Sequence, residues 1–144
     1  MGTRSRIGIQ LSDDSILSVY HHWDGYPEWL GRILKTHFNT REQVSELIDG
    51  GDMSVCWTKE RWGDVNEYGG QMKKEVEEYG PQYYSERGED CPPRLDNSIV
   101  EYLANGEEFA YIFNRKNEWV AVDRHEFDDK DPEIVPIPDG ALAV

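Results

Sequence analysis

Five neighbouring residues near the start of the chain carry the side chains best suited to chemistry: His21, His22, Trp23, Asp24 and Tyr26. Imidazole and carboxylate groups bind divalent metal ions and also act as general acids and bases. If the two histidines lie in a β-strand, their side chains point to opposite faces of the sheet, so they cannot share one ion. His22 and Asp24 can share one, but a third ligand would have to come from His37 or His125. We therefore predict neither a metal site nor a bound cofactor.

Three arginines, Arg4, Arg6 and Arg32, flank this cluster in the sequence. Trp, Tyr and Arg are the residues that most often anchor interfaces, so the region is a candidate binding surface for a partner or a small anionic ligand. We expect replacement of Arg4 and Arg6 to weaken binding of such a ligand and to leave the fold intact. The alternative is structural, with the aromatic side chains closing the core beside a turn.

The two cysteines, Cys56 and Cys91, lack the paired spacing of a thiolate zinc site or of a disulfide-rich fold. Cys56 lies in an apolar segment, which favours a buried and unreactive thiol. The sequence also lacks the nucleotide-binding glycine loops and the GxSxG and HExxH motifs. We predict no catalytic residues. The alternative is a small hydrolase or nucleotide-acting enzyme that uses His22 and Asp24.

The residues on either side of the cluster predict a hairpin and two helices. Apolar and polar residues alternate over 7–11, a polar turn follows over 12–15, and a second apolar segment covers 16–20. Pro27 is well placed to begin a helix, because apolar residues three or four positions apart follow it. Thr40 and Gln43 form a capping box that begins a second helix.

An acidic, aromatic segment over 59–97 is the second candidate binding region. A short strand over 53–57 precedes it, and its many Gly, Pro, Asp and Glu residues predict an irregular segment with one short helix over 71–78. Long loops in compact domains are usually functional. Ser98 and Glu101 then predict a capped helix that continues through Leu103.

The clearest hairpin of the sequence covers 109–113 and 119–122, where large apolar residues alternate with smaller ones. Residues 126–144 are acidic and then proline-rich, which predicts an extended C-terminal tail. Two hairpins, a lone strand and two or three helices indicate an α+β fold with an antiparallel sheet built from the N- and C-terminal hairpins. The length fits a single domain over 1–144.

Negative charge is concentrated in the later part of the chain, whose net charge is −14. Residues 1–52 contribute −3 and residues 53–144 contribute −11. Because phosphate binding needs a basic face, we expect no direct binding to nucleic acid. The acidic surface either confers solubility or mimics nucleic acid in the basic groove of a partner. The sequence contains no apolar run that predicts a membrane span, and the isolated cysteines favour a cytoplasmic location.

The strings MGTRSRIGI at 1–9 and HHWDGYPEWLGRIL at 21–34 resemble the N-terminal signature of small proteins of tailed phages and prophages. Those proteins begin with a Gly-Thr-Arg-Ser stretch and carry a Trp-Asp-Gly-Tyr-Pro turn before a helix. The resemblance covers roughly residues 1–50. It implies an accessory protein that acts in the cytoplasm of an infected bacterium, with a host or defence protein as its partner.

These observations favour a non-enzymatic, acidic binding protein of phage type, since catalysis normally leaves a visible nucleophile, metal set or phosphate loop. We predict that it engages a host or defence macromolecule, with mimicry of nucleic acid as one mode, or that it sequesters a small anionic ligand. The residues predicted to bind are Arg4, Arg6, His21, His22, Trp23, Asp24, Tyr26 and Arg32.

Overall fold

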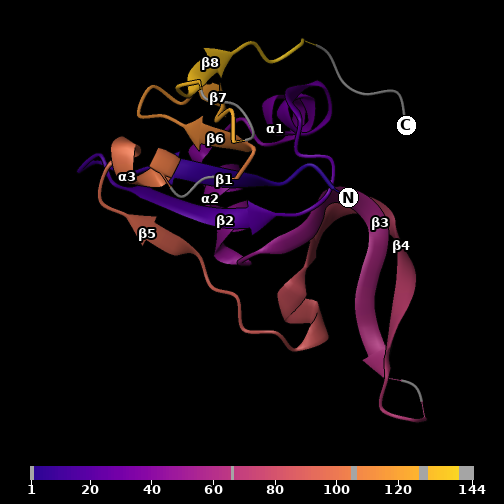
Figure 1. Ribbon diagram of the computed structural model, residues 1–144. Helices are drawn as coiled ribbons and strands as arrows, with labels where there is room; N and C mark the ends of the chain where they lie inside the picture. The colour runs from indigo at the N-terminus through magenta and orange to yellow at the C-terminus, as the bar shows by residue number, and fades with distance from the viewer. Residues whose placement is uncertain (1, 66, 105–106, 127–129, 140–144) are drawn as a thin grey trace.

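The computed structural model describes residues 2–65, 67–104, 107–126 and 130–139. These residues form one eight-stranded mixed β-sheet with helices on both faces (Figure 1). The strand order is β4-β3-β2-β1-β6-β7-β8, and β5 pairs with β2 outside this order. The predicted α+β class is therefore confirmed.

The N-terminal hairpin lies at the centre of the sheet. β1 (Ser5–Gln10) and β2 (Ile16–His21) pair antiparallel, as the alternating sequence predicts. Ile7 and Ile9 of β1 point into the main core, whereas Gly8 between them faces the opposite side of the sheet. The period of two along the strand thus decides which face each side chain reaches.

Two successive helical segments cover the main core. A five-residue π-helical turn (Pro27–Gly31) begins at the predicted proline and continues into α1 (Arg32–His37). α2 (Arg41–Asp49) begins with the predicted capping box, in which the Thr40 hydroxyl accepts from the Gln43 amide. The apolar side chains of these helices pack against the sheet: Leu30, Ile33, Leu34, Val44, Leu47 and Ile48.

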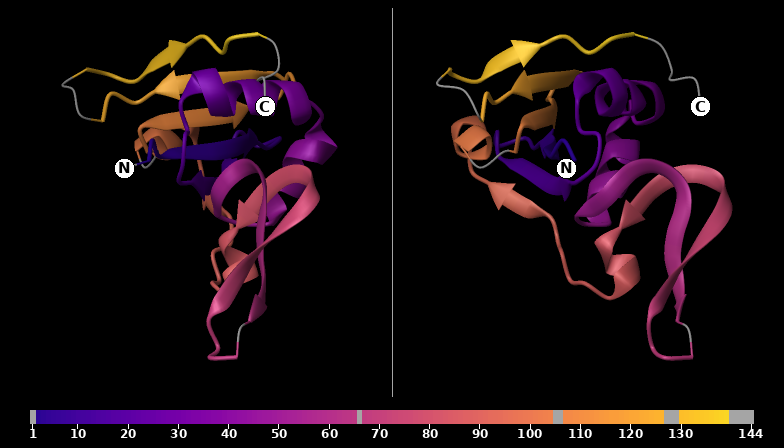
Figure 2. Two further views of the ribbon diagram at one scale, coloured as in Figure 1. Left: turned by 90° about the vertical axis from the view of Figure 1, so that its right-hand side faces the viewer. Right: turned by 45° about the vertical axis from the view of Figure 1, so that its right-hand side comes forward.

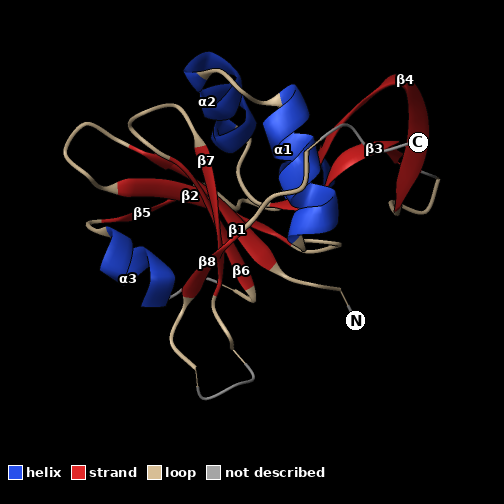
Figure 3. Cartoon of the chain, turned by 90° about the horizontal axis from the view of Figure 1, so that it is seen from above, coloured by secondary structure: helices blue, strands red, loops and turns tan. Residues whose placement is uncertain are grey.

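A third helix, α3 (Ile99–Ala104), covers part of the opposite face of the sheet (Figure 3). Its Tyr102 is fully buried, and the Tyr102 hydroxyl donates to the carbonyl oxygen of Tyr111 at 2.9 Å. At the start of the helix the Ser98 hydroxyl accepts from the Glu101 amide, as the capping pattern predicts. The second face therefore has its own, smaller core.

Two strand pairings are parallel, which differs from the expected antiparallel sheet. β3 (Met53–Val65) joins the end of β2 in parallel, and β6 (Phe109–Phe113) lies parallel to β1. Helices precede both strands in the chain, α1 and α2 before β3 and α3 before β6. A helical crossover returns the chain in the same strand direction, and it therefore produces parallel neighbours.

A long hairpin of β3 and β4 (Gln71–Tyr83), called the arm below, projects from the body of the molecule (Figure 2). The arm corrects two predictions, because 59–97 is not irregular throughout and 71–78 forms a strand in place of the expected short helix. Long charged side chains favour a helix in isolation, but β3 supplies a pairing partner for this stretch. The pairing contains four register shifts, which increase the twist of the ribbon.

The chain returns from the arm to the sheet through a short 3-10 turn, η2 (Tyr84–Arg87), and β5 (Arg94–Asp96). β5 pairs antiparallel with the first half of β2. It therefore occupies the same edge of β2 that β3 meets farther along.

The C-terminal hairpin of β6 and β7 (Trp119–Asp123) is antiparallel, as predicted. β8 (Glu133–Val135) adds an edge strand beside β7, so part of the expected extended tail belongs to the sheet. The His125 ring contributes to this attachment, with Nε2 2.7 Å from Oε1 of Glu133. The predicted tail also includes 127–129 and 140–144, which lie outside the described residues.

Candidate functional site

His21 is a structural residue in the main core. Its Nε2 accepts a hydrogen bond from the Cys56 amide at 3.0 Å, and its Nδ1 lies 3.4 Å from the Ser5 hydroxyl. A backbone amide can only donate, so the proton of the neutral ring is on Nδ1. Burial lowers the pKa of His21 to about 3, which keeps the ring uncharged at neutral pH. Neither nitrogen is available to a ligand.

Neither cysteine thiol is activated as a nucleophile. Cys56 is fully buried, and burial raises the pKa of its thiol. Cys91 is half-buried in the segment between η2 and β5, and desolvation followed by the charge of Asp52 raises its pKa as well. A nucleophilic cysteine needs a lowered pKa. The predicted inert thiol at Cys56 fits this environment.

His22 points away from His21, as strand alternation requires, and joins a small aromatic cluster. The Tyr20 hydroxyl lies 2.6 Å from Nδ1 of His22, and the Trp23 ring packs edge-on against the imidazole at 4.7 Å. Burial and then the nearby Arg4 guanidinium lower the pKa of His22. We call Arg4, Tyr20, His22 and Trp23 the N-terminal corner. Trp23 is 44% exposed and is the largest apolar surface of the corner.

Asp24 does not join His22 to form a catalytic or metal-binding pair. No hydrogen bond or ion pair links the two side chains within the described residues. Asp24 instead has a φ of +55° in the turn, and Gly25 follows with its amide bonded to the Thr3 carbonyl at 2.8 Å. Carboxylates tolerate the left-handed region better than most side chains. The residue type at position 24 is therefore explained by the turn.

Arg6 is not part of a ligand-binding surface, which corrects the sequence prediction. Its side chain is buried beside β2, where Nε donates to the Ser18 hydroxyl at 3.0 Å and Nη2 donates to the Ser18 carbonyl at 3.2 Å. Burial, followed by the charge of Arg94, lowers the pKa of Arg6. Asp96 is also buried there and pairs with Arg94 at 3.1 Å. The Arg6 guanidinium is a partner for groups inside the protein.

The two arginines should therefore respond differently to replacement. We expect Arg6→Ala to lower the free energy of unfolding by about 2 kcal/mol, because it removes buried charge-assisted hydrogen bonds. Arg4 is exposed, and we expect Arg4→Ala to change stability by less than about 0.5 kcal/mol. Urea denaturation of the two variants measures both values. Equal losses would contradict the assigned positions.

The remaining predicted site residues occupy other parts of the structure. Arg32 is the first residue of α1, on the opposite face of the sheet from Arg6, and its Nε is buried without a hydrogen-bond partner among the described residues. Tyr26 caps the π-helical turn, and its carbonyl oxygen accepts from the amides of Trp29 and Leu30. Of the three predicted arginines, Arg4 alone belongs to the N-terminal corner.

The four histidines do not converge either. His37 stacks on Trp57 at the end of α1, and His125 contacts Glu133 beside β8. Within the part of the chain that the structure describes, no three His, Cys, Asp or Glu side chains are grouped to hold a metal ion. Over the same residues, no helix has the length and apolar character of a membrane span.

The arm carries the larger candidate surface, and residues there were not individually predicted. On the side next to α1, the rings of His37, Trp57 and Tyr79 stack in succession, with centroid distances of 4.0 and 5.6 Å. The Lys59 ammonium continues this column, 5.1 Å from the centre of the Tyr79 ring. We call these four residues the first aromatic column. Its base is anchored in the core by Trp57.

A second aromatic column lies where the arm meets η2. The Trp62 ring contacts two cations, with Nζ of Lys73 5.2 Å and Cζ of Arg87 5.1 Å from its centre. Cζ of Arg87 also lies 5.0 Å from the Tyr84 ring centre. We call Trp62, Lys73, Tyr84 and Arg87 the second aromatic column. Each such contact contributes roughly 0.5–1 kcal/mol at an exposed position. Scattered aromatic residues in 59–97 were the sequence signal for this surface, but their pairing depends on strand register.

Comparison with known proteins adds nothing to this geometry. The chain matches no protein-family model, no curated protein and no solved structure.

Proposed function

We propose that this chain is a non-enzymatic, acidic binding protein of tailed-phage type that engages a host or defence protein in the bacterial cytoplasm. The observation that carries the proposal is the arm, a ribbon of two strands that projects from the body (Figure 2). Both aromatic columns include residues of the arm. The resemblance of the N-terminal strings to phage proteins supports the cellular setting.

The far part of the arm exposes apolar surface that a partner can bury. The base is held firmly, since the Tyr83 hydroxyl donates to the Leu47 carbonyl at 2.7 Å. Beyond it, Tyr68 is 89% exposed and Met72 is 48% exposed. An isolated two-stranded ribbon is marginally stable in water because it buries little apolar area. Contact with a partner would therefore stabilise the arm as well as hold the complex together.

The second aromatic column offers a further anchor beside this apolar surface. The Trp62 side chain is partly exposed, whereas its Nε1 is buried and has no hydrogen-bond acceptor among the described residues. A partner would therefore contact the ring of Trp62 and not this nitrogen. Tryptophan and arginine side chains also dominate the binding energy of most interfaces. Trp62 and Arg87 are therefore our proposed anchors.

The net charge of −14 favours a partner with a basic surface. Opposite charges accelerate encounter, so the association rate should fall as salt concentration rises. Where the basic surface is the nucleic-acid groove of a defence protein, the chain would bind there as a mimic of nucleic acid. Competition by duplex DNA for the captured partner would distinguish that mode from binding elsewhere on the partner.

Paired variants with matched exposure test the role of the arm. Val100 on α3 is 80% exposed, so it is a suitable control for Tyr68 at 89%. We expect Tyr68→Ala to reduce recovery of the partner from bacterial lysate by about tenfold, as for an interface anchor, and Val100→Ala to leave recovery unchanged. Quantitative mass spectrometry of the captured proteins measures both, and thermal unfolding checks that the variants are folded.

A photo-crosslinking amino acid placed at each position gives a second readout. The partner should be linked from position 68 and not from position 100. If both positions capture the same proteins with equal yield, or if Tyr68→Ala retains full recovery, the arm is not the binding element and the proposal fails.

A further inference from the structure

The turn over 11–15, after β1, and the turn over 114–118, after β6, lie at the same end of the sheet. They do so because β1 and β6 are parallel neighbours and therefore end on the same side. The Arg115 amide joins the two turns by donating to Oε1 of Gln10 at 3.2 Å. The arm meets β2 at the other end of that strand, so the two turns are separate from the proposed binding element.

A cavity of about 450 Å³ lies beside the two turns. Its volume is within the range of small-molecule sites, which are about 300–1,000 Å³. Asp and Glu outnumber Lys and Arg by 29 to 15 in the sequence, yet no acidic side chain is among the described residues that line this cavity. Two arginines are among them. The lining residues are Gln10, Leu11, Ser12, Arg41 and Arg115.

Arg41, the first residue of α2, is held in place by both turns. Its Nη1 donates to the Gln10 carbonyl at 3.0 Å, and its Nη2 donates to the Asn114 carbonyl at 2.9 Å. Its Nε donates to Oδ1 of Asn117 at 3.2 Å, and its Cζ lies 5.6 Å from the centre of the Phe113 ring. A guanidinium has five N–H donors, so one donor on each Nη is left for a ligand. The ligand would meet a cation that is already positioned.

Arg115 and Ser12 supply further donors to the cavity. Nη1 of Arg115 pairs with Asp14 at 3.1 Å, and Asp14 is not among the residues that line the cavity. Within the described part of the chain, Nε and Nη2 of Arg115 and the hydroxyl of Ser12 have no hydrogen-bond partner. Both residues are exposed, so an ion in solution can reach these donors.

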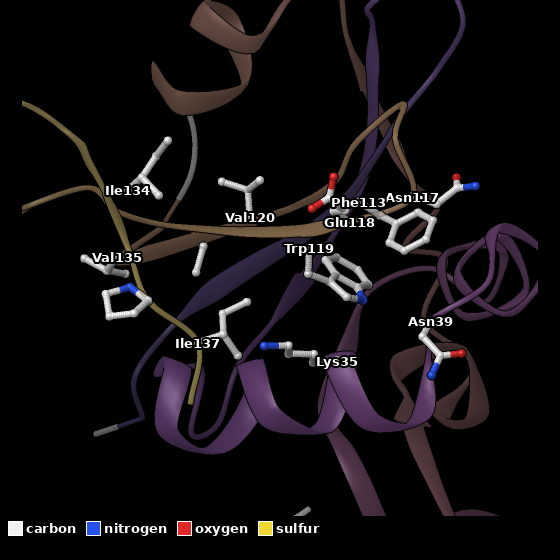
Figure 4. A pocket seen from close by; sticks show the side chains of 12 residues that line it. Lys35, Asn39, Phe113, Asn117, Glu118, Trp119, Val120, Ile134, Val135 and Ile137 are labelled. Atoms are coloured by element: carbon white, nitrogen blue, oxygen red, sulfur yellow. The ribbon is translucent and has the colours of Figure 1, made fainter. Parts of the chain in front are cut away.

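The cavity between α1, β7 and residues 134–137 does not have this cationic character. Lys35 lines it from α1, but Glu118 lines it as well (Figure 4). The charges of these two residues are opposite, and Lys35 also forms an ion pair with Asp139. An anion is therefore attracted more strongly to the cavity with two arginines.

A phosphate group matches the donors of the two-arginine cavity. A phosphate monoester carries a charge of about −1.5 to −2 at neutral pH and has three strong acceptor oxygens, whereas a carboxylate has one charge and two oxygens. Planar guanidinium groups bind phosphate through pairs of N–H···O bonds. Two guanidinium groups from separate elements can bind different oxygens of one phosphate. The donor set thus favours phosphate over carboxylate.

We propose that this cavity binds a phosphate group, either as inorganic phosphate or as the phosphate of a small ester. The group lies between Arg41 and Arg115 and accepts a further hydrogen bond from the Ser12 hydroxyl. Leu11 and the alkyl parts of the arginines contact the organic body of an ester. The site goes beyond the proposed function of the arm and does not depend on it.

Titration of the full chain with inorganic phosphate at low, constant ionic strength tests the proposal, with backbone amide NMR signals as the readout. We expect a dissociation constant of about 1 mM and signal changes concentrated in the two turns and at Arg41. Acetate should bind at least about tenfold more weakly, because it offers one charge and two oxygens. Phenyl phosphate distinguishes the two sources: tighter binding than inorganic phosphate indicates an ester, and weaker binding indicates the free ion.

Two adjacent cations in the turn after β6 provide matched variants. Arg115→Gln and Lys116→Gln each remove one positive charge from an exposed position, but Lys116 does not line the cavity. We expect Arg115→Gln to weaken phosphate binding by about tenfold, Ser12→Ala by about threefold and Lys116→Gln by less than about twofold. Thermal unfolding checks that the variants are folded. The proposal is overturned if phosphate does not bind, if the signal changes are spread over the whole surface, if acetate binds equally well, or if Arg115→Gln and Lys116→Gln have equal effects.

Discussion

Replacing Gly51 with alanine is expected to lower the free energy of unfolding by about 3 kcal/mol. Gly51 lies between α2 and β3 and has a φ of +86°. Residues with an L side chain adopt this backbone conformation only with strain. A Cβ at this position would also overlap the carbonyl oxygen of Cys91. That oxygen accepts a hydrogen bond from the Asp52 amide at 2.9 Å, so moving it away would break a backbone contact between the residue before β3 and the segment before β5.

Gly69 is a matched control for this substitution. It has nearly the same φ, +85°, but nothing lies within 4 Å of an added Cβ. Gly69→Ala should therefore cost only the backbone strain, about 1 kcal/mol. Urea denaturation of both variants separates the two contributions. Equal losses would show that the overlap with Cys91 is relieved without cost.

Acidification is expected to destabilise the protein through His21 over the range from pH 6.5 down to about 3. In the unfolded chain the imidazole binds a proton as the pH falls below 6.5, whereas the buried ring in the folded protein stays neutral until about pH 3. The unfolded state therefore binds more protons in this range, and stability falls as the pH falls. The loss is about 1.4 kcal/mol for each pH unit over the steep part of the range.

His21→Gln isolates this contribution from that of the carboxylates. The variant loses stability at neutral pH because it disturbs the hydrogen bond to the Cys56 amide, but it should lack the proton-linked slope. Denaturant midpoints of both proteins at several values between pH 4 and pH 7.5 give the difference in slope. Parallel curves for the two proteins would mean that His21 does not titrate differently in the folded and unfolded states.

Local sequence patterns predicted the elements that short-range contacts determine. The alternation over 7–20 and over 109–122 predicted both hairpins, and the Thr40–Gln43 capping box predicted the start of α2. Pro27 likewise marked the beginning of the helical segment. In each case the residues that determine the structure lie within a few positions of one another.

Elements that depend on distant partners were not predicted in the same way. Residues 71–78 carry charged side chains typical of an exposed helix, and only their pairing with β3 makes them a strand. The parallel pairing of β1 with β6 joins residues about 100 positions apart, which no local pattern indicates. The sheet therefore differs from the expected one where its order depends on crossovers.

In the candidate site, too, local features were predicted and features that depend on distant residues were not. Strand alternation correctly placed His21 and His22 on opposite faces, because that requires only the local period. The burial of Arg6 against Ser18 depends on the neighbouring strand and on α3, so the sequence suggested a surface arginine. The aromatic columns depend on the register of the arm, which includes four shifts. The binding roles proposed for the N-terminal corner and for the arm stay predictions.

The parallel pairing of β1 and β6 also has a consequence for how the protein is synthesised. Ser5 pairs opposite Phe109, so the N-terminal hairpin has no neighbour on that edge until the chain has been translated through β6. During that interval Ile7 and Ile9 belong to an open edge strand, which is a template for aggregation. Contacts of such high sequence separation also slow folding. Folding of this small protein should therefore be largely post-translational, and its yield should depend on chaperones that shield the waiting hairpin.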